Sequence, residues 1–278
     1  FDSLIPNYQP SVTRIFSACE AMTSLIGNLF SYGTQSTISA ATESLDKVTS
    51  IEIKEKASVI EAVTALLGQE IEMANRYSIL ADGKQIFYAV EQTDFFTRQA
   101  KQCCPDCAPW NVSILYTGEG KAEPAFILDR PWTMTCCCFN RPVVNILEAS
   151  SKTPMGSIQD PFACCDLTFT LMDSGGKDVL KGNGGCCQPG LCCPLPCGPC
   201  ANVHFPIIET ETSKQVGNVT KKVPGCLKFI FAPDVDNYKV DFSDISDSKL
   251  KVLVMVLAIF IDFRYFSNNT NDDERRED

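Results

Sequence analysis

The longest uninterrupted apolar segment of the chain is VLVMVLAIFI, residues 252–261. Charged residues bound it on both sides, with Lys249 and Lys251 before it and Asp262 and Arg264 after it. Ten residues of helix rise about 15 Å, against roughly 30 Å for the core of a bilayer. The pattern favours an element buried in the protein's own core, and a strained membrane span is the alternative. An all-apolar segment does not distinguish helix from strand.

A second pattern lies near the beginning of the chain, where apolar residues recur at helical spacing over residues 12–30. We expect an amphipathic helix that packs on the main domain or on a partner protein. Lying flat on a membrane is the alternative, although a single Arg14 makes a poor basic face. Residues 32–50 are rich in Ser, Thr and Ala, with a weak helix from about Ala40, and they place a domain boundary there. Residues 1–50 are therefore interpreted as an N-terminal helical extension.

From residue 51 the chain changes to short alternating segments separated by turn residues. IEIKEK at 51–56 is typical of a strand, and residues 58–69 return to helical spacing. From Asn75 onward the pattern shows strands and turns with no helical pattern between them. The expected strands are 77–80, 85–91, 111–116, 125–128, 143–148, 155–159, 167–172, 178–181, 203–209, 215–219 and 227–231.

Short strands in regular succession favour a closed antiparallel sheet, here a mainly β barrel of about twelve strands. The interior of a barrel of that size must be filled by another element, and the apolar segment 252–261 is the candidate. We therefore predict one barrel domain over residues 51–267, with a central hydrophobic helix at about 249–266. An acidic, disordered tail is expected at 268–278. The helix residues expected in the barrel centre are Val252, Val256, Ile259 and Phe260.

The charge of the chain limits its partners. The 278 residues are 45% hydrophobic and 21% charged, with a net charge of −10. A protein that binds the phosphate backbone is normally basic, so nucleic acid is unlikely as the main partner. The same charge opposes a delocalised attraction to anionic lipid. Any membrane contact is expected to be local, covalent or bridged by a metal ion.

Sixteen cysteines are unusual, and most of them stand in adjacent groups. Adjacent cysteines seldom bridge one another, and a chain of this length does not need disulfide staples, so we expect reduced thiols and an intracellular protein. The chain begins with Phe1, so a missing leader stays open. Its one histidine, His204, lies in a strand pattern and is interpreted as structural. With no nucleophile-elbow, phosphate-loop or dinucleotide motif, covalent catalysis is not expected.

Several segments in order resemble the phospholipid scramblases, over about residues 51–266. They are NRYSILADGKQIFYAVEQ (75–92), DRPWTMTCCCF (129–139), FIFAPDVDNYKVDF (229–242) and IFIDFRYF (259–266). The resemblance implies a tubby-like fold, in which a twelve-stranded barrel surrounds a C-terminal helix. It also implies palmitoylation and Ca²⁺-dependent movement of phospholipids between leaflets, without covalent chemistry.

The resemblance places a Ca²⁺ loop near the C-terminus. Ca²⁺ prefers six to eight oxygen ligands, and carboxylates at alternate positions of a loop can supply part of that number. Lys239 stands where the family has a glycine, and a solvated acidic turn leading into a strand is the alternative. The residues concerned are Asp234, Asp236, Tyr238, Val240 and Phe242, with Asp241 and Asp244 as additional acids.

Two cysteine groups carry further expectations. Cys136, Cys137 and Cys138 match the family's palmitoylation segment, and clustered exposed thiols suit acylation because stable anchoring requires two chains. Unmodified thiols are the alternative. Cys193, Cys197 and Cys200 have a spacing similar to a metal knuckle, so zinc is a candidate ligand, with plain surface thiols as the alternative.

Two functions follow from these observations. The first is a membrane-associated protein on the cytoplasmic face that binds phospholipid or moves it in both directions with Ca²⁺. The second is a tubby-like scaffold, docked by residues 12–30 into a larger cytoplasmic assembly, without lipid-moving activity. A mitochondrial or other organellar membrane is the alternative location.

Overall fold

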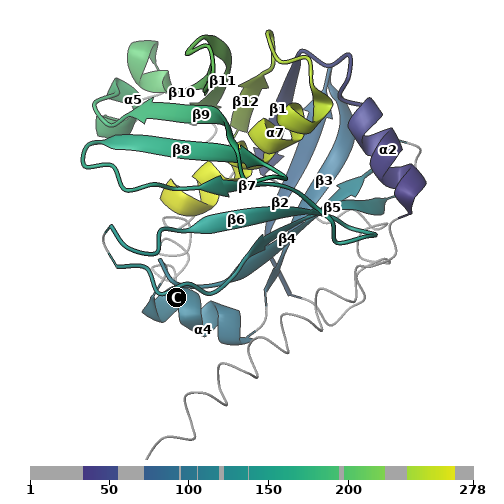
Figure 1. Cartoon of the computed structure of the whole chain (residues 1–278). Helices are drawn as coiled ribbons and strands as arrows, with labels where there is room; N and C mark the ends of the chain where they lie inside the picture. The colour runs from purple at the N-terminus through teal and green to yellow at the C-terminus, as the bar shows by residue number, and fades with distance from the viewer. Residues whose placement is uncertain are drawn as a thin grey trace, which may run out of the picture.

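The computed structural model describes residues 34–55, 72–93, 95–104, 106–118, 122–136, 138–193, 197–222 and 237–266. Over these ranges the chain is mainly β, and twelve strands close a barrel around a C-terminal helix (Figure 1). The strands are β1 (Ser50–Glu55), β2 (Glu72–Ala81), β3 (Lys84–Thr93), β4 (Trp110–Tyr116), β5 (Glu123–Arg130), β6 (Val143–Glu148), β7 (Pro154–Gln159), β8 (Asp166–Asp173), β9 (Asp178–Gly185), β10 (Asn202–Glu209), β11 (Gln215–Lys222) and β12 (Asn237–Asp241). The helices are α2 (Gln35–Glu43), α4 (Phe95–Cys103), α5 (Pro189–Cys192) and α7 (Ser248–Tyr265), with a 3₁₀ turn at Gly198–Ala201.

The barrel has the simplest antiparallel connectivity, because each strand pairs with the next one along the chain. The ring closes where β1 pairs antiparallel with β12, and Ile53 of β1 lies opposite both Ile79 of β2 and Tyr238 of β12. Asp82 and Gly83, a residue pair typical of hairpin turns, join the expected strands 77–80 and 85–91 in the hairpin of β2 and β3. Both residues have positive φ angles, 49° and 76°, as the tightest hairpin turns require. The closed antiparallel barrel predicted from the strand pattern is therefore confirmed.

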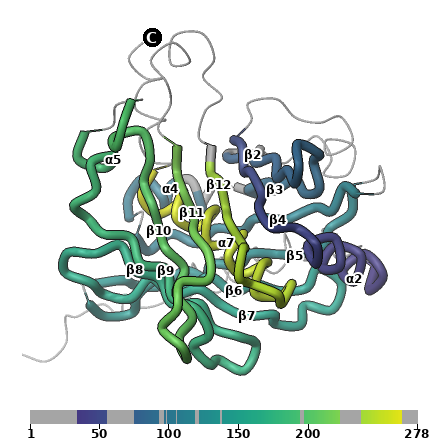
Figure 2. Tube along the Cα trace, turned by 90° about the horizontal axis from the view of Figure 1, so that it is seen from above, coloured from purple at the N-terminus to yellow at the C-terminus, as the bar shows by residue number. Residues whose placement is uncertain are grey.

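Helix α7 occupies the interior of this barrel. Every residue of the apolar segment 252–261 is buried, including the four residues expected in the barrel centre: Val252, Val256, Ile259 and Phe260. Figure 1 shows α7 inside the ring of strands, and Figure 2 shows the same enclosure from above. Among the described helices, none combines the length and the apolar character needed to cross a bilayer. The buried-element interpretation of the apolar segment is confirmed.

Glycines in the barrel wall let α7 approach the strands. A Cβ atom added to Gly156 of β7 would lie 2.8 Å from a methyl group of Leu253 and 2.5 Å from the Met172 carbonyl oxygen. A Cβ atom on Gly182 of β9 would lie 3.0 Å from a methyl group of Leu257. At these two positions the absence of a side chain therefore lets α7 lie close to the strands.

Helix α2 lies outside the barrel against β5, as both views show (Figures 1 and 2). Thr34 caps its first turn, and its inner face contributes Ile38 and Ala41 to the core. The Thr37 hydroxyl donates a hydrogen bond of 2.5 Å to the Glu123 carboxylate of β5. A helix within the predicted extension 1–50 thus packs directly on the barrel, while the position of the domain boundary stays a prediction.

The expectation of strands and turns alone after residue 75 is wrong at α4, which lies between β3 and β4. The helix is held by Lys101, which forms an ion pair with buried Glu91 and lies 5.2 Å from the ring centre of Phe263 in α7. The predictions for residues 12–30, 58–69, 227–231 and 268–278 fall outside the described residues.

Candidate functional site

The sequential antiparallel topology gives the barrel two different ends. Connections that follow odd-numbered strands meet at one end, which we name the cysteine end. Connections that follow even-numbered strands form the opposite end, which we name the turn end. Helix α7 begins at the turn end, where buried Lys251 donates to the carbonyls of Leu45, Asp46 and Val48 at 2.8–2.9 Å. It finishes at the cysteine end.

All thirteen described cysteines lie at the cysteine end, and all of them are free thiols. They come from four connections that are separate in the sequence: β3–β4, β5–β6, β7–β8 and β9–β10. The sequence showed the grouping of these residues, but only strand order shows that they converge. They are Cys103, Cys104, Cys107, Cys136, Cys138, Cys164, Cys165, Cys186, Cys187, Cys192, Cys193, Cys197 and Cys200.

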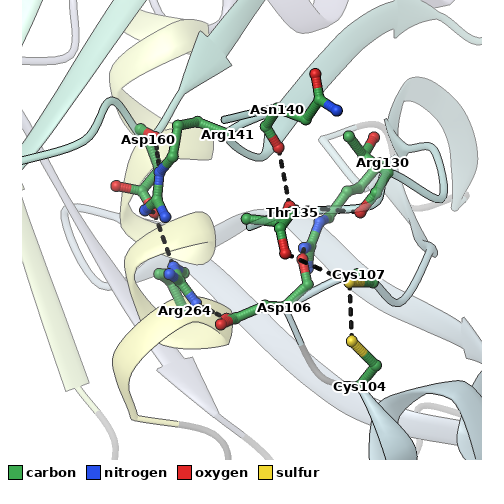
Figure 3. A network of polar contacts seen from close by, with 10 residues as sticks. Cys104, Asp106, Cys107, Arg130, Thr135, Asn140, Arg141, Asp160 and Arg264 are labelled. Atoms are coloured by element: carbon green, nitrogen blue, oxygen red, sulfur yellow. Dashed lines mark hydrogen bonds and ion pairs between the residues drawn. The ribbon is translucent and has the colours of Figure 1, made fainter. Parts of the chain in front are cut away.

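A buried ion-pair network ties the end of α7 to these loops (Figure 3). Arg264 of α7 donates through Nε to Asp160 Oδ2 at 2.8 Å, and Arg141 donates through Nη2 to the same oxygen at 2.6 Å. Burial alone would lower the pKa of Arg264, but hydrogen bonding to Asp160 and the charges of Asp160 and Asp106 raise it overall. Asp160 is 2% exposed, so two guanidinium groups compensate a carboxylate that water cannot reach.

The same network continues into the β3–β4 connection. Arg264 also pairs with the Asp106 carboxylate, and Arg130 donates to the Asp106 carbonyl oxygen (Figure 3). Burial, together with the nearby charge of Arg264, lowers the pKa of Arg130 to about 10. Beside Asp106, the Cys104 and Cys107 thiols lie 2.8 Å apart, and their hydrogen bond raises the pKa of Cys104. The end of α7, two arginines and a thiol pair therefore form one connected unit.

A second polar cluster lies two residues earlier on α7, inside the barrel. Asp262 is 1% exposed and accepts hydrogen bonds from the hydroxyls of Tyr77 at 2.6 Å and Tyr238 at 2.7 Å. The Lys221 ammonium lies 3.6 Å from Asp262 and 4.0 Å from the ring centre of Phe266. In the sequence, Asp262 is simply the first charged residue after the apolar segment. The groups that make its burial possible, Tyr77, Lys221 and Tyr238, lie on strands that are distant in the sequence.

These buried tyrosines predict a loss of stability in alkali. Burial and the charge of Asp262 raise the pKa of Tyr77 well above 10, and burial and the charge of Asp160 raise that of Tyr265 to about 12. Tyrosines of the unfolded chain ionise near pH 10. Between about pH 10 and 12 the unfolded state therefore loses protons that the folded state keeps, and stability falls as pH rises. Urea unfolding at pH 9 and 11 measures the decrease, and Tyr265→Phe should make it smaller. An unchanged decrease in that variant would assign the effect to other groups.

The residues expected to bind Ca²⁺ do not form one group in the described part of the chain. Tyr238, Val240 and Phe242 alternate inward and are buried, which is the pattern of a strand rather than of a cation-binding loop. At the turn end, Asp241 accepts from the Ser243 backbone at 3.0 Å, and Asp244 pairs with Lys214 at 2.8 Å. Asp234 and Asp236 lie outside the described residues, so the first half of the predicted loop stays untested.

The two predicted cysteine sites also differ. Cys136 and Cys138 are exposed, next to a tight turn closed by backbone hydrogen bonds between Cys136 and Phe139, and Cys137 lies outside the described residues. Partial burial raises the pKa of Cys200, and the neighbouring Cys193 and Cys197 add to this shift. Across the described ranges, however, no three His, Cys, Asp or Glu side chains are arranged to hold a metal ion.

His204, expected to be a structural residue, lies on the outer face of the barrel. Its Nδ1 atom lies 3.3 Å from both Asn218 Nδ2 and Thr220 Oγ1 on the neighbouring strand. The imidazole is thus exposed and held by cross-strand contacts.

The described structure defines a single closed barrel with an enclosed C-terminal helix and one end rich in thiols. The Scramblase family model matches residues 31–268, and the chain belongs to that family. It is 27% identical over 235 residues to phospholipid scramblase 1 of Rattus norvegicus, covering 84% of this chain and 64% of the relative. It is 30% identical over 209 residues to phospholipid scramblase 2 of Bos taurus, covering 74% and 66%. It is 24% identical over 202 residues to phospholipid scramblase 4 of Homo sapiens, covering 71% and 56%.

The chain thus spans about two thirds of the length of the first two of these relatives. No solved structure is significantly similar to it.

Proposed function

We propose that this protein attaches to the cytoplasmic face of a membrane and moves phospholipids between leaflets in both directions, in response to Ca²⁺. The observation that carries the proposal is the family match over residues 31–268 to proteins named phospholipid scramblases. The convergence of thirteen free thiols at one end of the barrel supports it, because acyl chains need accessible clustered thiols. This is transport without covalent chemistry, so no catalytic residue is assigned.

Attachment through acyl chains is the first part of the proposal. Two chains anchor a protein far more stably than one, and Cys136 and Cys138 are both exposed at the turn that backbone hydrogen bonds between Cys136 and Phe139 close. Replacing Cys136, Cys137 and Cys138 with Ser should remove most hydroxylamine-sensitive palmitate labelling and shift the protein from the membrane pellet to the supernatant in cells. The matched control replaces Cys186, Cys187 and Cys192. Labelling that persists at the original level in the first variant would place acylation elsewhere.

Ca²⁺ binding by the acidic segment is the second part. At the turn end Asp241 accepts from the Ser243 backbone and Asp244 pairs with Lys214, so the carboxylate ligands that we propose are Asp234 and Asp236, which precede β12 in the sequence. Lys239 reduces the local negative charge, so weak binding is expected. Calorimetry with millimolar Ca²⁺ should show heat that decreases in Asp236→Ala, and the absence of heat in the unaltered protein would remove Ca²⁺ from the proposal. Zinc held by Cys193, Cys197 and Cys200 is proposed only as a structural ligand, and elemental analysis tests it.

Reconstitution tests the activity itself. Purified protein in vesicles with a fluorescent phospholipid should speed dithionite bleaching of inner-leaflet label, more with Ca²⁺ than with chelator. Bleaching at the rate of protein-free vesicles under both conditions would contradict the proposal.

A scaffold without lipid-moving activity is the second candidate. Helix α7 fills the described interior of the barrel, with all of residues 252–261 buried, so the helix in this position does not offer its apolar face to lipid. In this case the protein would co-purify with a partner protein through residues 12–30, and deleting that segment would abolish the co-purification. The vesicle assay would show no lipid movement with either form of the protein.

A further inference from the structure

The two ends of the barrel differ in charge as well as in cysteine content. At the cysteine end, three stretches of loop contain no charged residue: 131–140 and 161–165, which are flanked by Arg141 and Asp160, and 186–201, whereas the β3–β4 connection at the same end is charged. The turn end, in contrast, has a charged residue in each connection, such as Asp82, Lys177 and Glu211. In a chain with 21% charged residues and a net charge of −10, charge-free loops confined to one end require an explanation.

The same end carries the large apolar side chains that the described structure leaves exposed. Trp132, Met134 and Phe139 in the β5–β6 loop are 41%, 67% and 71% exposed, and Phe162 in the β7–β8 loop is 54% exposed. We name these four residues the apolar patch. Apolar side chains of this size are normally covered by a partner or a membrane when they gather on one surface.

Hydrogen bonds and an ion pair join the two loops of the patch where they leave the barrel. The Asp160 backbone donates to the Pro142 carbonyl at 3.0 Å, and Arg141 pairs with the Asp160 carboxylate at 2.6 Å. Within the first loop, the Thr135 hydroxyl donates to the Asn140 carbonyl at 2.9 Å. Arg141 and Asp160, the charges at the base of the two loops, are therefore compensated inside the protein, and the loop residues between them and the exposed Asp166 carry no charge.

We propose that the apolar patch inserts into the interface of a zwitterionic bilayer, so that the cysteine end faces the membrane and the turn end faces water. This inference rests on the proposed membrane role and adds the orientation. Aromatic side chains are enriched at membrane interfaces, and the uncharged loops avoid the repulsion that an anionic surface would exert on this acidic chain. Exposed thiols at Cys136, Cys138, Cys164 and Cys165 lie in the same two loops, so acyl chains attached there would enter the same leaflet.

The orientation is tested with full-length protein that carries no acyl chains. Flotation with phosphatidylcholine vesicles should recover the unaltered protein, and Met134→Ser, Phe139→Ser and Phe162→Ser together should weaken binding at least tenfold, since each buried apolar side chain contributes about tenfold or more in affinity. The matched control, Lys177→Ser with Glu211→Ser, removes an exposed ion pair at the turn end without changing the net charge and should bind normally.

Tryptophan fluorescence gives a second measurement. Of the two tryptophans, Trp110 is 3% exposed and Trp132 is 41% exposed, so a blue shift on adding vesicles reports Trp132. Brominated lipid should quench the fluorescence of Trp132. The blue shift should vanish in Trp132→Phe. The melting temperature of each patch variant should stay unchanged, because the altered side chains are exposed.

The outcomes separate this inference from the proposed function. Equal flotation of the patch variant, or no flotation of the unaltered protein, would overturn the orientation even if lipid movement is observed. A patch variant that changes from dimer to monomer without any change in flotation would show that the patch is an interface between protein copies. Patch-dependent flotation without lipid movement would support the orientation and contradict the scramblase activity.

Discussion

Val256→Asp should abolish the folded state of the barrel. Val256 lies in the middle of α7 and is completely buried, surrounded by the strands on all sides. An unpaired carboxylate at this position costs several kcal/mol, about 5 or more, against the 5–15 kcal/mol that typically stabilises a protein. We expect insoluble protein, or a melting temperature lowered by about 10 °C or more, measured by calorimetry or circular dichroism.

The matched control introduces the same residue into the same helix at an exposed position. Lys249 is exposed in the first turn of α7, where a negative charge is compatible with the helix dipole. Lys249→Asp should therefore leave the melting temperature within a few degrees of the original. A Val256→Asp protein that melts at the original temperature would contradict the central position of α7.

Asp262→Ala should produce the second largest loss. This variant leaves the hydroxyls of Tyr77 and Tyr238 and the ammonium of Lys221 without the carboxylate that they share. Removing one partner from a buried charged cluster costs about 3–5 kcal/mol, because the remaining groups stay buried. Urea unfolding should show a midpoint shifted to lower concentration with an unchanged slope.

Two further variants separate charge from packing. Asp262→Asn keeps an oxygen acceptor for one tyrosine hydroxyl and should lose less stability than the alanine variant. The double variant Asp262→Leu with Lys221→Met removes both charges and should also lose less than Asp262→Ala, because no buried charge is left alone. Equal losses in all three variants would contradict this reasoning, because they would show that neither the amide oxygen of Asn nor the removal of the Lys221 charge recovers any stability.

The centre of the fold was predictable because the apolar pattern is strong and continuous. Residues 252–261 have no polar face, and a barrel of about twelve strands offers them a place. The hairpin at Asp82-Gly83 was equally predictable, since both residues suit positive φ angles. The strand limits were less accurate: β9, for example, continues to Gly185 rather than ending at residue 181.

What the sequence did not show depends on contacts between distant residues. Lys251 marks the edge of the apolar segment, yet it is 3% exposed because backbone carbonyls about 200 positions earlier accept its hydrogen bonds. The sequence around Asp160 does not indicate its partners, because Arg141 and Arg264, which donate to its carboxylate, stand 19 and 104 positions away. Helix α4 was missed because it is only nine residues long, so its apolar spacing completes few turns.

The pairing of β1 with β12 has a consequence for how the protein is made. A ribosome releases the first strand long before the last, and the element that fills the barrel follows the last strand. Until α7 has been synthesised, the inward-facing apolar surface of the nascent sheet has nothing to cover it. We expect chaperones to bind such a nascent chain. A premature stop codon before residue 248 would remove α7 and leave an unfilled barrel with exposed apolar surface, which cellular proteases would degrade.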